Sequence, residues 1–175
     1  VVLYVRRSPE TDDSDTGSTT ESTGSSTAAD SVATSSTHSE PEWETTVAPA
    51  DETLHDVALD GDTAYAVGDD GVVLAGDGDG WTVALPDGPG AASNTLYGVA
   101  ATDGSIWFVG ESGAVGHLDG STGGHVDYSA PNGDTNALED VAVAGSNDGE
   151  TVLVVDGSGQ VRRGRYRGQE LVWDD

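Results

Sequence analysis

The stretch that decides the fold is LHDVALDGDTAYAVGDDGVV, residues 54–73. It returns 42 residues later as LYGVAATDGSIWFVGESGAV, residues 96–115, with its apolar positions in the same phase. A third copy starts with LEDVA at residue 138 and continues with VVDGSGQV at 154–161, where the offset has grown to 46 residues. We place the four extra residues within 145–149. A two-part pattern repeated in phase indicates a repeat architecture.

Each copy is predicted to form four short strands. Turns rich in Gly and Asp divide the apolar runs, and no helical period connects them. A repeat of about 40–45 residues with four strands is typical of a β-propeller blade. We therefore predict an all-β, propeller-like fold with three four-stranded blades in residues 42–175. The repeats span about 54–95, 96–137 and 138–175, and the first has strands at 54–59, 63–67, 72–75 and 81–85.

Paired glycines mark the turn between the second and third strands of each repeat. They are Gly68, Gly71, Gly110, Gly113, Gly157 and Gly159. In the first two repeats we expect both members of the pair to supply positive φ angles. The acids between the glycines change from copy to copy while the glycines remain, which favours a structural turn over an ion-binding loop.

The repeat sequences resemble a known group of proteins. LYGVAATDGSIWFVGESGAVGHLD at 96–119, YSAP at 128–131 and the VGxxGxV turns are similar to the BNR/YVTN/WD-like repeat propellers of haloarchaea, which are related to photosystem II assembly-factor propellers. The sialidase Asp-box, S-x-D-x-G-x-x-W, is not matched, because DGDGW at 77–81 lacks its Ser and its spacing. The resemblance covers about 42–175 and implies the architecture, not the sialidase active site.

A leading strand precedes the first repeat. EWETTVAP at 42–49 is similar to GWTVALP at 80–86, the fourth strand of the first repeat. Propellers have four to eight blades, so three blades and one outer strand predict a truncated propeller or half of an assembled ring. Open terminal blades favour association, and a second copy that closes the ring is one expected partner. Trp and Tyr side chains are expected to pack the blades: Tyr65, Trp81, Trp107, Tyr128 and Trp173.

The charge is extreme. Asp and Glu outnumber Lys and Arg by 32 to 6, a formal charge of −26, and Lys and Cys are both absent. Such a field disfavours nucleic acid and anionic membranes, and compact folding then depends on screening by salt and nonspecific cations. The composition resembles that of proteins from extreme halophiles. The lack of Cys excludes disulfides and thiolate chemistry.

Two segments precede the repeats. Residues 1–7, VVLYVRR, are interpreted as a short start that could be the remnant of a signal or anchor, and they are too short to enter a membrane. Residues 8–41 are rich in Ser, Thr and acids and are predicted to be a disordered stalk. This organisation favours an extracellular or cell-surface location, with a cytoplasmic disordered tail as the alternative.

No catalytic, cofactor or metal residues are predicted. An EF-hand starting at Asp77 would need Gly at its sixth position and Glu at its twelfth, where Thr82 and Gly88 stand, so a hairpin turn is favoured over a weak cation site. No carboxylate pair is marked for glycosidase chemistry. The four histidines have no metal-ligand spacing and are interpreted as surface or core residues: His38, His55, His117 and His125.

Four arginines in one segment are the clearest candidate for partner docking. Arg163, Arg165 and Arg167 would share one face of a strand, with Arg162 beside them. They either pair with the protein's own carboxylates or dock an acidic partner or a second copy of the chain. The resulting expectation is a non-catalytic module that binds an unidentified protein or glycan; the alternative is a fragment of a propeller hydrolase or lyase whose catalytic blades are missing.

Overall fold

The computed structural model describes residues 2–6, 43–146 and 149–174. The Ser/Thr-rich segment 8–41 lies outside these residues, so its disorder stays a prediction. All three blades lie within one compact unit of the chain. In the described part of the chain, no helix is both long and apolar enough to cross a bilayer.

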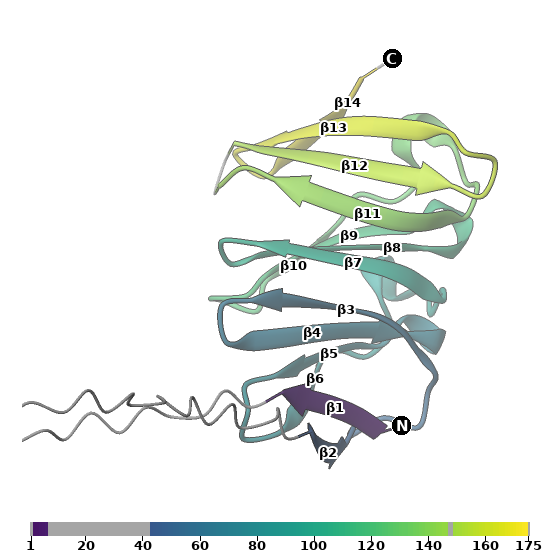
Figure 1. Ribbon diagram of the computed structural model, residues 1–175. Helices are drawn as coiled ribbons and strands as arrows, with labels where there is room; N and C mark the ends of the chain where they lie inside the picture. The colour runs from purple at the N-terminus through teal and green to yellow at the C-terminus, as the bar shows by residue number, and fades with distance from the viewer. Residues whose placement is uncertain (1, 7–42, 147–148, 175) are drawn as a thin grey trace, which may run out of the picture. The chain divides into compact units, whose positions relative to one another are not determined.

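The predicted all-β architecture is confirmed as three four-stranded antiparallel sheets, whose strands follow sequence order (Figure 1). Blade 1 contains β3 (Leu54–Asp60), β4 (Thr63–Gly68), β5 (Val73–Gly76) and β6 (Trp81–Leu85). Blade 2 contains β7 (Leu96–Thr102), β8 (Ser105–Gly110), β9 (Val115–Asp119) and β10 (His125–Asp127). Blade 3 contains β11 (Leu138–Ala144), β12 (Glu150–Asp156), β13 (Val161–Arg167) and β14 (Glu170–Trp173).

The sequence repeat corresponds to a structural repeat down to its irregularities. Each innermost strand has the same break in register, which follows Leu54, Leu96 and Leu138. The extra residues of the third repeat lengthen the connection between β11 and β12, as predicted. The innermost strands β3, β7 and β11 lie next to one another along the series of blades (Figure 1).

Each blade has two faces, because side chains alternate along its strands. We call the face toward the next blade the leading face and the opposite one the trailing face. The leading face of blade 1 contributes Tyr65, Val67 and Val73 to a core with the trailing face of blade 2. Trp107, Val109 and Val115 occupy the same repeat positions in blade 2 and pack against the trailing face of blade 3. Tyr65 and Trp107 are thus buried between blades, and Tyr128 and Trp173 pack partly buried against the second core, as predicted. Trp81 instead packs on the trailing face of blade 1.

The turn glycines serve two purposes, and the prediction of positive φ is half wrong. Gly71 and Gly113 have φ angles of +77° and +68°, as expected. Gly68 and Gly110 are extended, with φ of −165° and −175°. A Cβ at Gly110 would lie 2.0 Å from the backbone oxygen of Thr95, so close backbone approach requires glycine there. Of the two turn glycines of the third repeat, Gly159 has positive φ, at +87°, and Gly157 does not.

The leading strand forms, but with a partner that was not predicted. It is β2 (Trp43–Val47), and it pairs with β1 (Val2–Arg6) in a two-stranded sheet. The sequence interpretation assigned residues 1–7 no secondary structure, so β1 is a strand that it missed. Ala48 and Ala50, just after β2, pack with Leu74 on the trailing face of blade 1.

Candidate functional site

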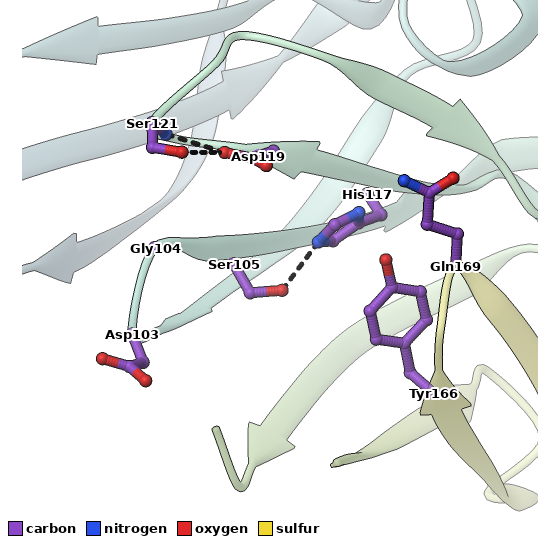
Figure 2. Close-up of a pocket in the computed structure, with 8 residues that line it drawn as sticks. All are labelled: Asp103, Gly104, Ser105, His117, Asp119, Ser121, Tyr166 and Gln169. Carbon is purple, nitrogen blue, oxygen red and sulfur yellow. Dashed lines mark hydrogen bonds between the residues drawn. The ribbon is translucent and has the colours of Figure 1, made fainter. Parts of the chain in front are cut away.

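A cavity of about 440 Å³ lies between blades 2 and 3. Blade 2 supplies its β7–β8 hairpin, the end of β9 and the loop after it, while blade 3 supplies β13 and the turn that follows. Figure 2 shows the side chains of Ser105, His117 and Tyr166 converging at this site. The described lining residues are Asp103, Gly104, Ser105, His117, Asp119, Ser121, Tyr166 and Gln169.

A buried polar cluster forms the floor of the cavity. Glu150, at the start of β12, is only 2% exposed. Its Oε2 accepts hydrogen bonds from the Ser105 hydroxyl at 2.9 Å and from Trp107 Nε1 at 2.7 Å. Two donors from blade 2 therefore hold a carboxylate of blade 3, which joins the two blades by buried polar contacts.

The proton positions in this cluster argue against a nucleophilic serine. A carboxylate only accepts hydrogen bonds, so the Ser105 hydrogen points to Glu150. The 2.7 Å contact between Ser105 Oγ and His117 Nε2 then requires His117 to donate. A general base needs a free lone pair facing the nucleophile and an acid on its other ring nitrogen. The cluster has neither, and Ser105 is only 2% exposed.

His117 is neutral at pH 7. Burial lowers its pKa below the ordinary value, and the negative charges of Glu150 and Asp119 offset part of that shift. Its ring packs against Trp107 and Tyr166, with centroids 4.7 and 4.9 Å away. The imidazole therefore adds a hydrogen-bonding wall to the cavity without adding positive charge.

The mouth of the cavity is negative. The Asp119 Oδ1 accepts hydrogen bonds from the hydroxyl and amide of Ser121 (Figure 2). It also accepts one from the amide of Thr122, and together these bonds lower the pKa of Asp119. Asp103 is exposed at the hairpin. Among the described residues that line the cavity, none is Lys or Arg. Two carboxylates and a neutral imidazole favour a positively charged ligand group.

The predicted arginine segment lies in β13, and none of its four arginines is among the described residues that line the cavity. Arg163, Arg165 and Arg167 share the exposed face of the strand, as predicted. Arg163 and Arg165 form ion pairs with Asp174, both at 2.5 Å. Arg162, on the other face, pairs with Asp134. Three of the four arginines thus contact the protein's own carboxylates, the first of the two alternatives drawn from the sequence.

The acids of the second-to-third-strand turns also have structural partners. His55 Nε2 lies 2.7 Å from Asp69 Oδ1, and this hydrogen bond lowers the pKa of Asp69. Tyr97 and Glu111 are the equivalent residues of blade 2, and the Tyr97 hydroxyl donates a hydrogen bond to the Glu111 carboxylate at 3.1 Å. In blades 1 and 2, the residue at the register break of the innermost strand thus forms a hydrogen bond with the acidic residue that begins the turn between the second and third strands. Throughout the described residues, no three His, Asp or Glu side chains are grouped to hold a metal ion.

Comparison with known proteins supports the fold. No protein-family model and no curated protein matches the sequence. The solved structure titled "YCF48 bound to D1 peptide" superposes with a TM-score of 0.59 at 16% identity, over 72% of this chain and 40% of that one. A second, "Crystal Structure of the N-terminal Domain of Nup159", gives a TM-score of 0.45 at 10% identity, over 70% of this chain and 30% of that one.

The fold is therefore propeller-like. The similarity to the photosystem II assembly-factor propeller that the repeat residues suggested is confirmed at the level of structure. This chain covers less than half the length of either neighbour.

Sequence reasoning missed the polar cluster. Ser105, His117 and Glu150 come from two repeats and carry no motif. One signal was present: His117 replaces Ala75 of the first repeat and Arg163 of the third at equivalent positions. A position where the residue type differs between otherwise matching repeats indicates a role that is specific to one blade.

Proposed function

We propose that this chain is a non-catalytic propeller module that binds a protein partner, and that the cavity between blades 2 and 3 receives a positively charged side chain of that partner. The observation that carries the proposal is the lining of the cavity. Asp103 and Asp119 supply negative charge, Tyr166 supplies an aromatic wall, and His117 adds no opposing charge. The volume of about 440 Å³ suits a side chain or a small ligand.

Two further observations support a protein partner. The structural neighbour with the TM-score of 0.59 is YCF48 bound to a D1 peptide. A guanidinium or ammonium group on a peptide would form charge-assisted hydrogen bonds with the two carboxylates. A neutral glycan, the other partner class expected from the sequence, would offer hydroxyls but no positive charge.

We also propose a high-salt setting and a cell-surface location. The formal charge of −26 without Lys supports the first, together with the resemblance to haloarchaeal propellers. The Ser/Thr-rich segment ahead of the blades supports the second. Nonspecific cations would screen the charge, and no cofactor is assigned.

Calorimetric titration with matched small probes tests the binding site. Nα-acetyl-L-arginine amide carries the guanidinium, and Nα-acetyl-L-citrulline amide is its neutral isostere. We expect the arginine probe to bind at least about tenfold more tightly, the ratio that follows when one charge-assisted hydrogen bond is lost. Equal affinities would refute recognition of positive charge, and preferential binding of methyl glucoside would favour the glycan alternative.

Variants that remove one carboxylate charge test whether the arginine probe binds in the cavity. Asp103→Asn and Asp119→Asn keep shape and the acceptor oxygen while they remove charge, and each should weaken the arginine probe. Asp62→Asn is the matched control, because Asp62 is exposed in the equivalent hairpin of blade 1. If Asp62→Asn weakens binding as much as the other two, the probe responds to the overall field of the protein and not to the cavity.

The hydrolase alternative has one candidate residue. Ser105 has a histidine 2.7 Å from its hydroxyl, so a fluorophosphonate probe provides a direct test. We expect no labelling, because the hydroxyl is buried and its hydrogen is held by Glu150. Labelling that disappears in Ser105→Ala would overturn the non-catalytic assignment.

A further inference from the structure

The turn between β12 and β13 departs from the equivalent turns of the other two blades. Asp156 stands at the repeat position of Gly110 in blade 2. In blade 2 the backbone approaches so closely at this point that the amide of Glu111 donates to the Thr95 oxygen at 2.9 Å, and blade 1 has the same hydrogen bond. Ala137 is the equivalent of Thr95, and among the described residues of blade 3 no equivalent bond to Ala137 is formed. A side chain does not fit the close approach, so the turn of blade 3 stands away from the segment before β11.

A second cavity, of about 260 Å³, lies at this place in blade 3. We call it the turn cavity. A Cβ at Gly110 would point at the Thr95 backbone oxygen, and Ala137, the equivalent of Thr95, lines the turn cavity. The side chain of Asp156 therefore points toward this cavity. Its described lining residues, none of which lines the cavity between blades 2 and 3, are Asn136, Ala137, Glu139, Asp156, Gly157 and Ser158.

Asp156 is buried, with 5% of its surface exposed, yet only one of its two oxygens is held. Its Oδ1 accepts hydrogen bonds from the hydroxyl and amide of Ser158, at 2.7 and 2.9 Å, and from the amide of Gln160 at 2.9 Å. These bonds, the one from the Ser158 hydroxyl above all, lower the pKa of Asp156 and keep it ionised at pH 7. The charge of Arg162 contributes, but Arg162 forms its ion pair with Asp134.

The second oxygen of Asp156 points to a ligand. Its Oδ2 is buried and has no hydrogen-bond partner among the described residues. A buried carboxylate oxygen without a partner costs free energy, because it has lost water and gained nothing in return. A ligand in the turn cavity that meets this oxygen would remove that cost.

Glu139 brings a second carboxylate to the turn cavity. Its equivalents, His55 and Tyr97, each form a hydrogen bond with the acidic residue that begins the turn. Blade 3 exchanges these roles, since the acid stands on β11 and Gly157 begins the turn. A Cβ at Gly157 would lie 3.2 Å from Glu139 Oε1, so the carboxylate lies against the turn. No Lys, Arg or His is among the described lining residues, and the two acids therefore share the turn cavity without a cation from its walls.

We propose that the turn cavity binds a divalent cation, calcium, between the carboxylates of Asp156 and Glu139. Calcium takes about six to eight oxygen ligands and combines carboxylates with amide oxygens, backbone oxygens and water. Asn136 offers a side-chain oxygen and Ala137 a backbone oxygen, so the site does not need three acids. Blades 1 and 2 have glycine at the position of Asp156, which confines the site to blade 3. The site is separate from the proposed binding of a partner side chain.

Nuclear magnetic resonance of the full chain, titrated with CaCl2 at about 2 M KCl, tests the proposal at the site itself. The high salt screens the overall charge of the protein. The amides of Ser158 and Gln160 report on the site, because both donate to Asp156. We expect their signals to shift saturably, with a Kd on the order of 10⁻⁴–10⁻³ M. The amides of Ser112 and Ala114, at the equivalent positions of blade 2, should not move.

Variants that remove one carboxylate charge complete the test. Glu139→Gln should weaken calcium binding at least about tenfold, because it removes one of two charged ligands, and its exposed position leaves folding unchanged. Asp156→Asn, whose folding is checked by circular dichroism, should abolish the shifts. Glu170→Gln is the matched control, since Glu170 is an exposed glutamate of the same blade outside the turn cavity, and it should bind calcium as wild type does.

Three results would overturn the proposal. The first is an absence of shifts at Ser158 and Gln160 in the wild-type chain at saturating CaCl2. The second is equal calcium affinity in Glu139→Gln and Glu170→Gln. The third is an equal response in the turns of blades 2 and 3, which would show that calcium follows the overall charge of the protein and not the turn cavity.

Discussion

Replacing Trp107 by Phe should destabilise the protein far more than the same change at Trp81. Trp107 is fully buried, and its indole nitrogen donates to the Glu150 carboxylate at 2.7 Å. Loss of a hydrogen bond to a charged group costs about 1.5–3 kcal/mol. The smaller Phe ring also leaves a void of about one to two methylene groups, which adds about 1 kcal/mol to the loss of stability. The sum is about 3 kcal/mol, a large part of the stability of a typical domain.

Urea unfolding at constant high salt, followed by far-UV circular dichroism, measures this difference. With a urea dependence of about 2 kcal/mol per M, Trp107→Phe should lower the midpoint by about 1.5 M. Trp81 is only half-buried and packs over Gly76, so Trp81→Phe should lower it by about 0.5 M or less. Equal shifts for the two variants would refute the role assigned to the buried Trp107–Glu150 hydrogen bond.

Three other predictions concern stability. Because burial lowers the pKa of His117, the unfolded chain takes up a proton first as the pH falls below about 6.5, and the folded state loses stability there. His117→Gln should therefore lose less stability than wild type between pH 7.5 and 5.5 in urea titrations; an identical loss would contradict this. Gly110→Ala should prevent normal folding, because its Cβ would meet the Thr95 oxygen, whereas Gly104→Ala, in open space at φ +82°, should cost about 1–2 kcal/mol. Thermal melts that rank the two glycine variants in the reverse order would be inconsistent with the two purposes assigned to these glycines. Finally, circular dichroism should show β-structure at about 2–4 M KCl that is lost at low salt, where the net charge is unscreened; equal folding in both would contradict the charge argument.

The repeat made most of the fold predictable. Strands bounded by Gly and Asp recur in phase, so a pattern such as LHDVALD identifies the same strand in every blade. Glycines were harder to interpret, because the sequence does not distinguish a positive φ from close backbone approach. Gly71 needs the first and Gly68 the second, yet both occur in the same turn.

The candidate site was not predictable for a related reason. A repeat pattern reports what the blades share, whereas the cavity is built from what they do not share. Glu150 follows the insertion of the third repeat, and His117 replaces an alanine of the first. His117 approaches Ser105 across the pairing of β8 and β9 within blade 2. Glu150 reaches Ser105 only because blades 2 and 3 pack together, which no local pattern encodes. The arginines were visible in the sequence, but their pairing with Asp134 and Asp174 required the structure.

The most direct test of the central claim follows the His117 ring by nuclear magnetic resonance during titration with Nα-acetyl-L-arginine amide. His117 lines the cavity, and its signals can be assigned by their loss in His117→Gln. We predict saturable shifts of these signals with the arginine probe, little change with the citrulline probe, and a weakened response in Asp119→Asn. His117 signals that do not move at saturating arginine probe, or that move equally with both probes, would contradict a cavity that recognises positive charge.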